Sequence, residues 1–347
     1  MMPQEFQSLP EGTRVSATTM KKIVLASGDF SRHMTNENFL MQRGFEQQGW
    51  ELCGWGYDTN LTDVPMILAA LKPDIVFQMD RRDWDKDSPG CFDPRVHFSR
   101  VEALADHPEI FKVAMVKDAG SAVNYQRASC EVIDADAIVM FYHDASAIPY
   151  SEFLKNYPRI RTYHTVDRDV CETMPLAKER RRGIVSGAVS SVYPLRRQAF
   201  RSAYALGIDV QDHPGYSNRG CQTNDYLRLL NCYRVHVATS SRYGFAVRKI
   251  MESVAMGCTP VTDLPIHDRL PEIDGALVRV SSRDCSINEL SDAINRADRD
   301  WDFERVSAFA EKARAFYDYR AVGKRMSDRI IELAMEKLCG SASKMTA

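Results

Sequence analysis

The sequence lacks the cysteine patterns that define several protein classes. Its cysteines never occur as Cys-x-x-Cys, the spacing typical of zinc sites and redox pairs. They are also odd in number and scattered, unlike the paired cysteines of a disulfide framework. The pattern therefore predicts reduced thiols in a cytoplasmic protein. The nine positions are Cys53, Cys91, Cys130, Cys171, Cys221, Cys232, Cys258, Cys285 and Cys339.

Long apolar segments are absent as well. No run approaches the roughly 18 residues that a membrane-spanning helix needs. The first 19 residues are polar and include Pro3, Pro10 and Gly12, without the apolar stretch of a secretory signal. We therefore expect no membrane span, a flexible N-terminal arm at 1–19 and a disordered tail at 339–347.

Neither sign of charge is in clear excess. The 45 basic and 47 acidic side chains give a net charge of −2 at pH 7. Proteins that bind mainly to a phosphate backbone are usually basic, so nucleic acid is disfavoured as the main partner, without excluding a local basic patch. No expected strand is followed by Gly-x-Gly-x-x-Gly, which disfavours a nicotinamide-dependent oxidoreductase.

What the sequence does contain is a regular alternation of short apolar runs and helical segments. With 347 residues, of which 44% are hydrophobic, the chain can form two cores. Short apolar strands separated by helices are typical of parallel sheets covered on both faces. The pattern predicts two doubly wound, Rossmann-like α/β domains facing across a cleft. Their expected strands cover 21–27, 51–55, 74–79, 111–116, 137–142 and 161–164, then 182–187, 208–210, 234–238, 259–262 and 276–280.

These elements predict a definite domain organisation. We expect an N-terminal domain over 20–170, a charged linker over 171–181 and a C-terminal domain over 182–315. The segment 302–338 has apolar residues at helical spacing, and we expect its final part, 316–338, to cross back onto the N-terminal domain.

The most informative segment lies between the strand expected at 234–238 and the strand expected at 259–262. A Ser/Gly loop leads into a helix that carries Arg248 and Lys249 in its first turn and Glu252 one turn later. Cations and free backbone N–H groups at a helix start favour a diphosphate, and Glu252 could accept hydrogen bonds from ribose hydroxyls. The alternative is a solvated i,i+4 ion pair between Arg248 and Glu252.

A second candidate is the turn after the strand expected at 182–187. Small residues around Gly187 would let a ligand approach the backbone, and Pro194 suits the first turn of the helix that carries Arg196. The alternative is an ordinary turn between a strand and a helix.

The segment 244–261 resembles the donor-binding signature of group 1 glycosyltransferases, particularly the spore-maturation CgeB-like branch. The matching residues are Gly244-Phe245, Arg248 and the run from Glu252 through Gly257 to Pro260-Val261. The resemblance implies the GT-B fold and a nucleoside-diphosphate sugar donor, UDP- or GDP-linked, with no cofactor. One departure is Gly244, which stands where members with a Glu-x7-Glu motif have their first glutamate.

By this resemblance, individual residues acquire expected roles in donor binding. Glu252 would hold the ribose, and Arg248 with Lys249 the diphosphate. The glycine loop would face the donor phosphates, and the loop after residue 212 would lie near the base. The donor-binding set implied in this way is Gly187, Arg196, Tyr216, Ser241, Arg248, Lys249 and Glu252.

Acid–base candidates are expected at strand ends of the N-terminal domain, which faces the acceptor in GT-B enzymes. We rank Asp118 first, because CgeB-like sequences also carry an aspartate after this strand, and His143 second. Asp29 with His33, and the run from Asp80 to Asp83, are further candidates. The alternative for each is a turn or helix-capping residue.

The sequence therefore predicts a glycosyltransferase acting on a hydroxyl of a small-molecule, glycan or protein acceptor. The absence of clustered His and Cys predicts no metal site, although Asp85/Asp87 and Asp134/Asp136 superficially resemble an Asp-x-Asp motif. Two alternatives stay open: a glycosyltransferase acting on a hydroxylated base in DNA, and a two-domain small-molecule binding protein without catalysis.

Overall fold

A computed structural model describes residues 20–26, 37–54, 62–79, 98–117, 119–120, 123–212 and 222–342. Several expectations fall outside these residues. They concern the N-terminal arm at 1–19, residues 343–347 of the tail expected at 339–347, and the candidates Asp29, His33, Asp80–Asp83, Asp85, Asp87, Asp118 and Tyr216. Residues 339–342 of that expected tail are helical instead, at the end of the last helix.

The N-terminal domain is built on one parallel sheet of six strands in the order β2-β1-β3-β4-β5-β6. All of its residues in β1, β3, β4 and β5 except Lys22 are buried, as expected of strands covered on both faces. The strands are β1 (Lys22–Leu25), β2 (Glu51–Cys53), β3 (Ile75–Gln78), β4 (Phe111–Val116), β5 (Ala137–Met140) and β6 (Arg159–Arg161).

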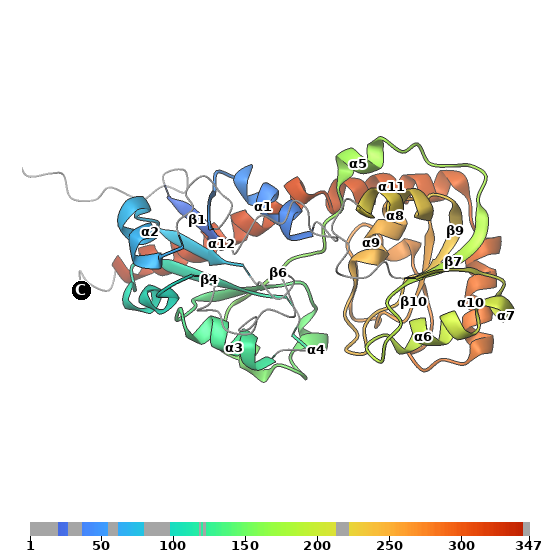
Figure 1. The fold of residues 1–347 in the computed structure, drawn as a ribbon, viewed down its shortest axis with the longest axis horizontal. Coiled ribbons are helices and arrows are strands. Elements are labelled where there is room, and N and C mark those ends of the chain that lie inside the picture. Colours follow the sequence, from blue (N-terminus) through green and yellow to red (C-terminus); the bar gives the residue numbers. More distant parts are fainter. Residues whose placement is uncertain are drawn as a thin grey trace, which may run out of the picture.

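Helices cover both faces of this sheet (Figure 1), with α1 on one face and α3 and α4 on the other. Asp63 caps α2 by accepting a hydrogen bond from the Met66 backbone N–H at 3.2 Å, which fixes where that helix begins. The helices of this half are α1 (Glu37–Glu46), α2 (Val64–Leu71), α3 (Val123–Glu131), α4 (Asp144–Ala147) and α5 (Arg168–Glu172), with 3-10 turns at Val101–Asp106 and Glu152–Asn156.

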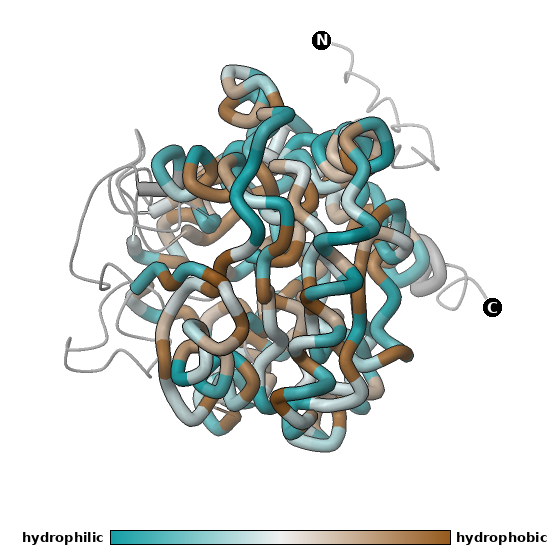
Figure 2. The backbone as a smooth tube through the Cα atoms, turned by 90° about the vertical axis from the view of Figure 1, so that its right-hand side faces the viewer, coloured by the Kyte–Doolittle hydropathy of each residue, from teal (hydrophilic) through white to brown (hydrophobic). Residues whose placement is uncertain are grey.

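The C-terminal domain repeats the plan with five parallel strands in the order β11-β10-β9-β7-β8. One buried cluster lies on each face of this sheet, and Figure 1 places α8, α9 and α11 on one face and α6 and α10 on the other. The strands are β7 (Arg181–Gly187), β8 (Asp209–Asp212), β9 (Tyr233–Val237), β10 (Thr259–Thr262) and β11 (Val278–Arg279). The helices are α6 (Pro194–Arg201), α7 (Ala203–Leu206), α8 (Gln222–Leu230), α9 (Arg248–Ala255), α10 (Ile287–Arg299) and α11 (Phe303–Phe316). In Figure 2, which faces this domain, hydrophilic and hydrophobic stretches alternate along the outer helices, as amphipathic helices require.

The last helix, α12 (Tyr319–Ala342), returns to the N-terminal domain and packs against α1. Val322, Met326, Ile330 and Ala334 face inward at four-residue spacing. The Trp50 indole N–H donates to the Ser327 hydroxyl at 2.8 Å across this contact. The expected fold class, two doubly wound domains with a returning C-terminal helix, is therefore confirmed.

Some element boundaries differ from the sequence-based expectation. The helical tail expected over 302–338 is two helices, because the chain breaks at Tyr317 and Asp318, where Asp318 accepts a hydrogen bond from the Arg320 backbone N–H at 2.8 Å. The strand expected at 161–164 lies earlier, as β6. The strand expected at 276–280 is reduced to the two residues of β11, because a 3-10 turn, Asp274–Ala276, occupies its start.

Candidate functional site

The strand order defines where a ligand fits in the C-terminal domain. Strand β7 lies between β8 and β9, so the chain leaves the sheet in opposite directions after β7 and after β9. In doubly wound sheets, ligands bind outside the carboxyl ends of the strands at this switch point. The turn after β7 carries Gly187, and the segment after β9, residues 238–247, is called here the donor loop and leads into α9.

Gly187 lies at the centre of the site. Its φ of +106° is a conformation that L side chains rarely adopt. A Cβ at this position would lie 2.9 Å from Lys249 Cε and 3.0 Å from Arg196 Nη1. The structure thus brings Lys249 next to Gly187 and Arg196, which the sequence analysis proposed from a different segment. Two cationic side chains converge on one bare stretch of backbone.

Protein atoms surround most of the Lys249 side chain, and the residue is half-buried. Its Nζ lies 3.9 Å from the ring centroid of Tyr226 on α8, a cation–π contact. Burial lowers the pKa of Lys249 to about 8, and repulsion from Arg196 and Arg248 adds to this shift against the opposing effect of Glu252. A bound anion would stabilise the charged lysine and reverse the shift.

A chain of hydrogen bonds links the backbone of Lys249 to Tyr226. The Tyr226 hydroxyl lies 2.9 Å from Ser186 Oγ, which lies 2.9 Å from His236 Nε2. His236 Nδ1 lies 2.5 Å from Ser253 Oγ, which donates to the Lys249 backbone carbonyl at 2.5 Å. Burial, together with Lys249 and Arg196, lowers the pKa of His236 well below its usual range, so the ring is neutral. A neutral ring donates one hydrogen bond and accepts the other. The chain connects the backbone of Lys249 to the ring under its own ammonium group.

Arg248 and Glu252 form the i,i+4 ion pair that the sequence analysis gave as the alternative, with Nε and Oε1 3.0 Å apart. It is not a solvated surface pair, because the two side chains are only 11% and 6% exposed. Val247, at the N-cap of α9, makes no side-chain cap hydrogen bond, and its carbonyl accepts from the first-turn Ile250 N–H at 3.0 Å.

Ser241 lies buried in the donor loop and shapes it. Its carbonyl accepts from the Gly244 N–H at 2.8 Å, and its hydroxyl accepts from the Tyr243 N–H at 3.3 Å. The preceding Ser240 N–H donates to buried Asp263 at 2.6 Å, which ties the loop to the end of β10. The donor loop is therefore held in a defined conformation from within.

On the N-terminal side, His143 caps α4 by accepting a hydrogen bond from the Ala145 N–H at 3.1 Å. Its ring lies 5.3 Å from that of His267, on the opposite domain. His143 thus faces the C-terminal domain, but its Nδ1 is occupied by the cap. Asp118 and Tyr216 cannot be placed beside it, since both lie outside the described residues.

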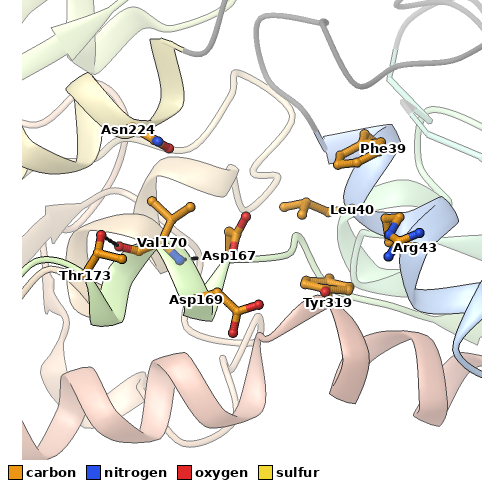
Figure 3. Close-up of a pocket in the computed structure, with 9 residues that line it drawn as sticks. All are labelled: Phe39, Leu40, Arg43, Asp167, Asp169, Val170, Thr173, Asn224 and Tyr319. Carbon is orange, nitrogen blue, oxygen red and sulfur yellow. Dashed lines mark hydrogen bonds between the residues drawn. The ribbon is translucent and has the colours of Figure 1, made fainter.

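A pocket of about 310 Å³ lies between the two domains (Figure 3). In Figure 3 the Asp167 carboxylate points toward the space between Val170 and Leu40. Burial raises the pKa of Asp167, which also caps α5 by accepting from the Val170 N–H at 3.2 Å. The lining residues are Phe39, Leu40, Arg43, Asp167, Asp169, Val170, Thr173, Asn224 and Tyr319.

Two general features concern other classes of site. Within the described residues, no group of three or more His, Cys, Asp or Glu side chains is arranged to hold a metal ion. In that same part of the chain, no helix is long and apolar enough to cross a membrane.

The sequence analysis missed several residues of the site. Tyr226 and His236 occupy ordinary helix and strand positions, and only the fold brings them to Lys249. Asp167 carried one local signal, since it precedes a short helix as a cap does. No spacing and no composition bias in the sequence identifies Tyr226 or His236 as site residues.

Comparison with known proteins adds the fold class. No protein-family model and no curated protein sequence matches the chain. Among solved structures it is similar to AviGT4, a glycosyltransferase involved in avilamycin A biosynthesis, with a TM-score of 0.50 and 11% identity over 92% of this chain and 98% of that one. It is also similar to the apo form of WaaB, a lipopolysaccharide outer core galactosyltransferase, with a TM-score of 0.50 and 8% identity over 93% and 100% of the two chains. The fold is therefore GT-B, as both structures share its two facing α/β domains.

A third structure differs in length. The pneumococcal O-GlcNAc transferase GtfA, in complex with UDP and GlcNAc, matches with a TM-score of 0.44 and 10% identity over 78% of this chain. This chain spans 59% of the length of that protein.

Proposed function

We propose that the protein is a glycosyltransferase that moves a hexosyl or related sugar from a UDP- or GDP-linked donor to a hydroxyl acceptor. The observation that carries the proposal is the convergence of Arg196 and Lys249 on Gly187 at the switch point of the C-terminal sheet. Cations enclosed by protein are costly unless an anion binds between them. A diphosphate supplies that charge, and the backbone at Gly187 leaves room for it.

The same residues assist the departure of the diphosphate. In the reaction the bond between the anomeric carbon and the diphosphate oxygen breaks, and the oxygen takes the electron pair. The acceptor oxygen bonds to the anomeric carbon and gives up its proton. Arg248, Lys249 and the first turn of α9 oppose the negative charge that develops, which is the role that a metal ion has in other enzymes. We propose that transfer proceeds without a metal.

Glu252 supports a nucleoside rather than an inorganic anion. Its side chain, 6% exposed, lies one turn from Arg248, where a ribose would follow the diphosphate. The segment 244–261 resembles the CgeB-like branch of group 1 glycosyltransferases at these positions, which supports placing the protein near that branch. The scattered cysteines support a cytoplasmic protein.

Asp118 and His143 remain our acceptor-side candidates, for a small-molecule, glycan or protein acceptor. Asp118→Asn separates a general base from a helix cap, because asparagine caps about as well as aspartate but accepts no proton. A base predicts turnover reduced about 10²- to 10⁴-fold with donor affinity unchanged. A folded variant with normal turnover would remove Asp118 from the site and leave His143.

The proposal is tested by incubating the protein with UDP- and GDP-linked sugars and measuring the nucleoside diphosphate released, with and without EDTA. Thermal shift with UDP and GDP identifies the preferred base, since a ligand of the folded state raises the melting temperature. We expect one diphosphate to stabilise the protein and its sugar to be consumed in EDTA. If no nucleotide sugar is consumed and none stabilises the protein, the proposal is wrong.

A further inference from the structure

The donor loop contacts the N-terminal domain at three positions, Tyr243, Phe245 and Ala246. The Tyr243 ring covers Gly120, where a Cβ would lie 2.5 Å from ring atom Cγ. The Phe245 ring stacks on Tyr142 with centroids 3.9 Å apart and planes inclined by 11°. The Ala246 carbonyl lies 3.2 Å from Nε2 of His164. These partners lie just after the carboxyl ends of β4, β5 and β6. The carboxyl end of the N-terminal sheet therefore contacts the second half of the loop at these three positions.

The third contact differs from the others because it ends in a buried charge cluster. His164 Nδ1 is hydrogen-bonded to Glu37 Oε1, and Lys117 Nζ lies 3.6 Å from Glu37 Oε2. Lys117 also donates to Asn38 Oδ1 at 3.0 Å. Glu37, Lys117 and His164 are 5%, 7% and 7% exposed. A group of charges this deep is expensive unless its members are paired.

Two polar contacts fix the orientation of the His164 ring. Both of its nitrogens face oxygens that can only accept, the Glu37 carboxylate and the Ala246 carbonyl. Burial alone would raise the pKa of Glu37, but His164, Lys117 and Arg248 hold it well below its usual range, so the carboxylate stays ionised. The His164 ring therefore bridges the Glu37 carboxylate and the Ala246 carbonyl, and it stacks on Phe141 with centroids 4.5 Å apart and planes inclined by 5°.

Ala246 precedes α9 by two residues, and α9 begins with Arg248 and Lys249. A fixed Ala246 carbonyl therefore fixes where those cations start. We propose that His164 is a positioning residue: held by Glu37 on one side and bonded to the Ala246 carbonyl on the other, it locks the donor loop and the start of α9 to the N-terminal domain. Its consequence for donor affinity rests on the proposed function.

The test uses His164→Gln, Glu37→Gln and the double variant of the full chain. The control is a second His–Glu pair in the same domain, His107 and Glu109, whose atoms lie 2.7 Å apart but whose side chains are 40% and 67% exposed. The matched control variants are His107→Gln and Glu109→Gln.

The first measurement is backbone hydrogen exchange of the ligand-free protein. We expect peptides covering 238–251 to exchange about tenfold faster in either site variant, as loss of a charged hydrogen bond allows. The double variant should match the single variants, because the pair acts as a unit. The control variants should match the wild type. Unchanged exchange in 238–251, or equal acceleration in β4 and β5, would show that His164 has no specific hold on the loop.

The second measurement is UDP and GDP affinity by calorimetry. We expect the nucleotide that binds the wild type to bind His164→Gln about tenfold more weakly, with no change in the control variants. Faster exchange with unchanged affinity would overturn the positioning role at the donor site. If neither nucleotide binds the wild type, the proposed function fails, while the exchange measurement still decides whether His164 locks the loop.

Discussion

The position of Lys249 makes its charge costly to the folded protein. Its pKa falls from 10.5 to about 8 on folding. Between these values the unfolded chain binds more protons, so the free energy of unfolding rises with pH across that window. Below pH 8 the full cost is present. Lys249→Met should therefore stabilise the ligand-free protein at pH 7, by on the order of 1 kcal/mol, and abolish the rise between pH 8 and 10.5.

Urea unfolding at several pH values measures this effect, with exposed Lys155→Met as the control. The same substitution should weaken diphosphate binding. A Lys249→Met variant that is less stable at pH 7 and binds UDP and GDP as the wild type does would contradict the assigned role.

Gly187 offers a second prediction at single-residue scale. Gly187→Ala adds backbone strain and a Cβ between Lys249 and Arg196, so it should cost about 1–2 kcal/mol of stability and weaken diphosphate binding about tenfold. Gly49→Ala is the matched control, because Gly49 also has a positive φ of +74° but nothing within 4 Å of an added Cβ. Calorimetric titration should show unchanged binding for Gly49→Ala. Equal effects on binding in the two variants would mean that Gly187 matters only for its backbone.

Among the elements, α12 packs closely against α1. A Cβ on Gly323 would lie 2.7 Å from the Gly44 backbone of α1, and one on Gly44 would lie 2.6 Å from the Tyr319 carbonyl. Gly323→Val should force the helices apart and cost about 1–3 kcal/mol. Urea unfolding against Arg329→Val, an exposed position on α12, isolates the contact. If both variants lose the same stability, the helix crossing is not the cause.

The elements also show what sequence reasoning could reach. Strands β4 and β10 have the predicted bounds, and in β4 the mostly apolar run ends at the polar residue Lys117. The break between α11 and α12 was missed, because it depends on the Asp318 side chain and on pairing between Val166 and Asp318, which are far apart in sequence. The 3-10 turn before β11 was missed because Arg279 and Asp274 form their ion pair only once the chain has folded.

At the scale of the whole molecule, the chain crosses between the domains twice, and the two crossings meet. The Val166 N–H donates to the Tyr317 carbonyl at 2.8 Å, and Arg320 bridges Asp169 and Asp318. The pocket of Figure 3 lies beside this junction, since Asp167, Asp169 and Tyr319 line it. The sequence pointed to Gly187, Arg196 and Lys249 as site residues, because a glycine turn and a helix start are local patterns. It did not predict Glu37, His164 or Asp167. Their contacts, between His164 and Glu37 and between Asp167 and the pocket, join segments that are far apart in the sequence.

Calorimetric titration of UDP and GDP tests the central claim most directly. It compares the wild type, Glu252→Ala and the double variant Arg196→Ala, Lys249→Met. We predict that one nucleoside diphosphate binds the wild type, that Glu252→Ala weakens it by about 1–3 kcal/mol through lost hydrogen bonds to ribose, and that the double variant abolishes measurable binding. Folded variants that all bind the nucleotide as tightly as the wild type would contradict the account.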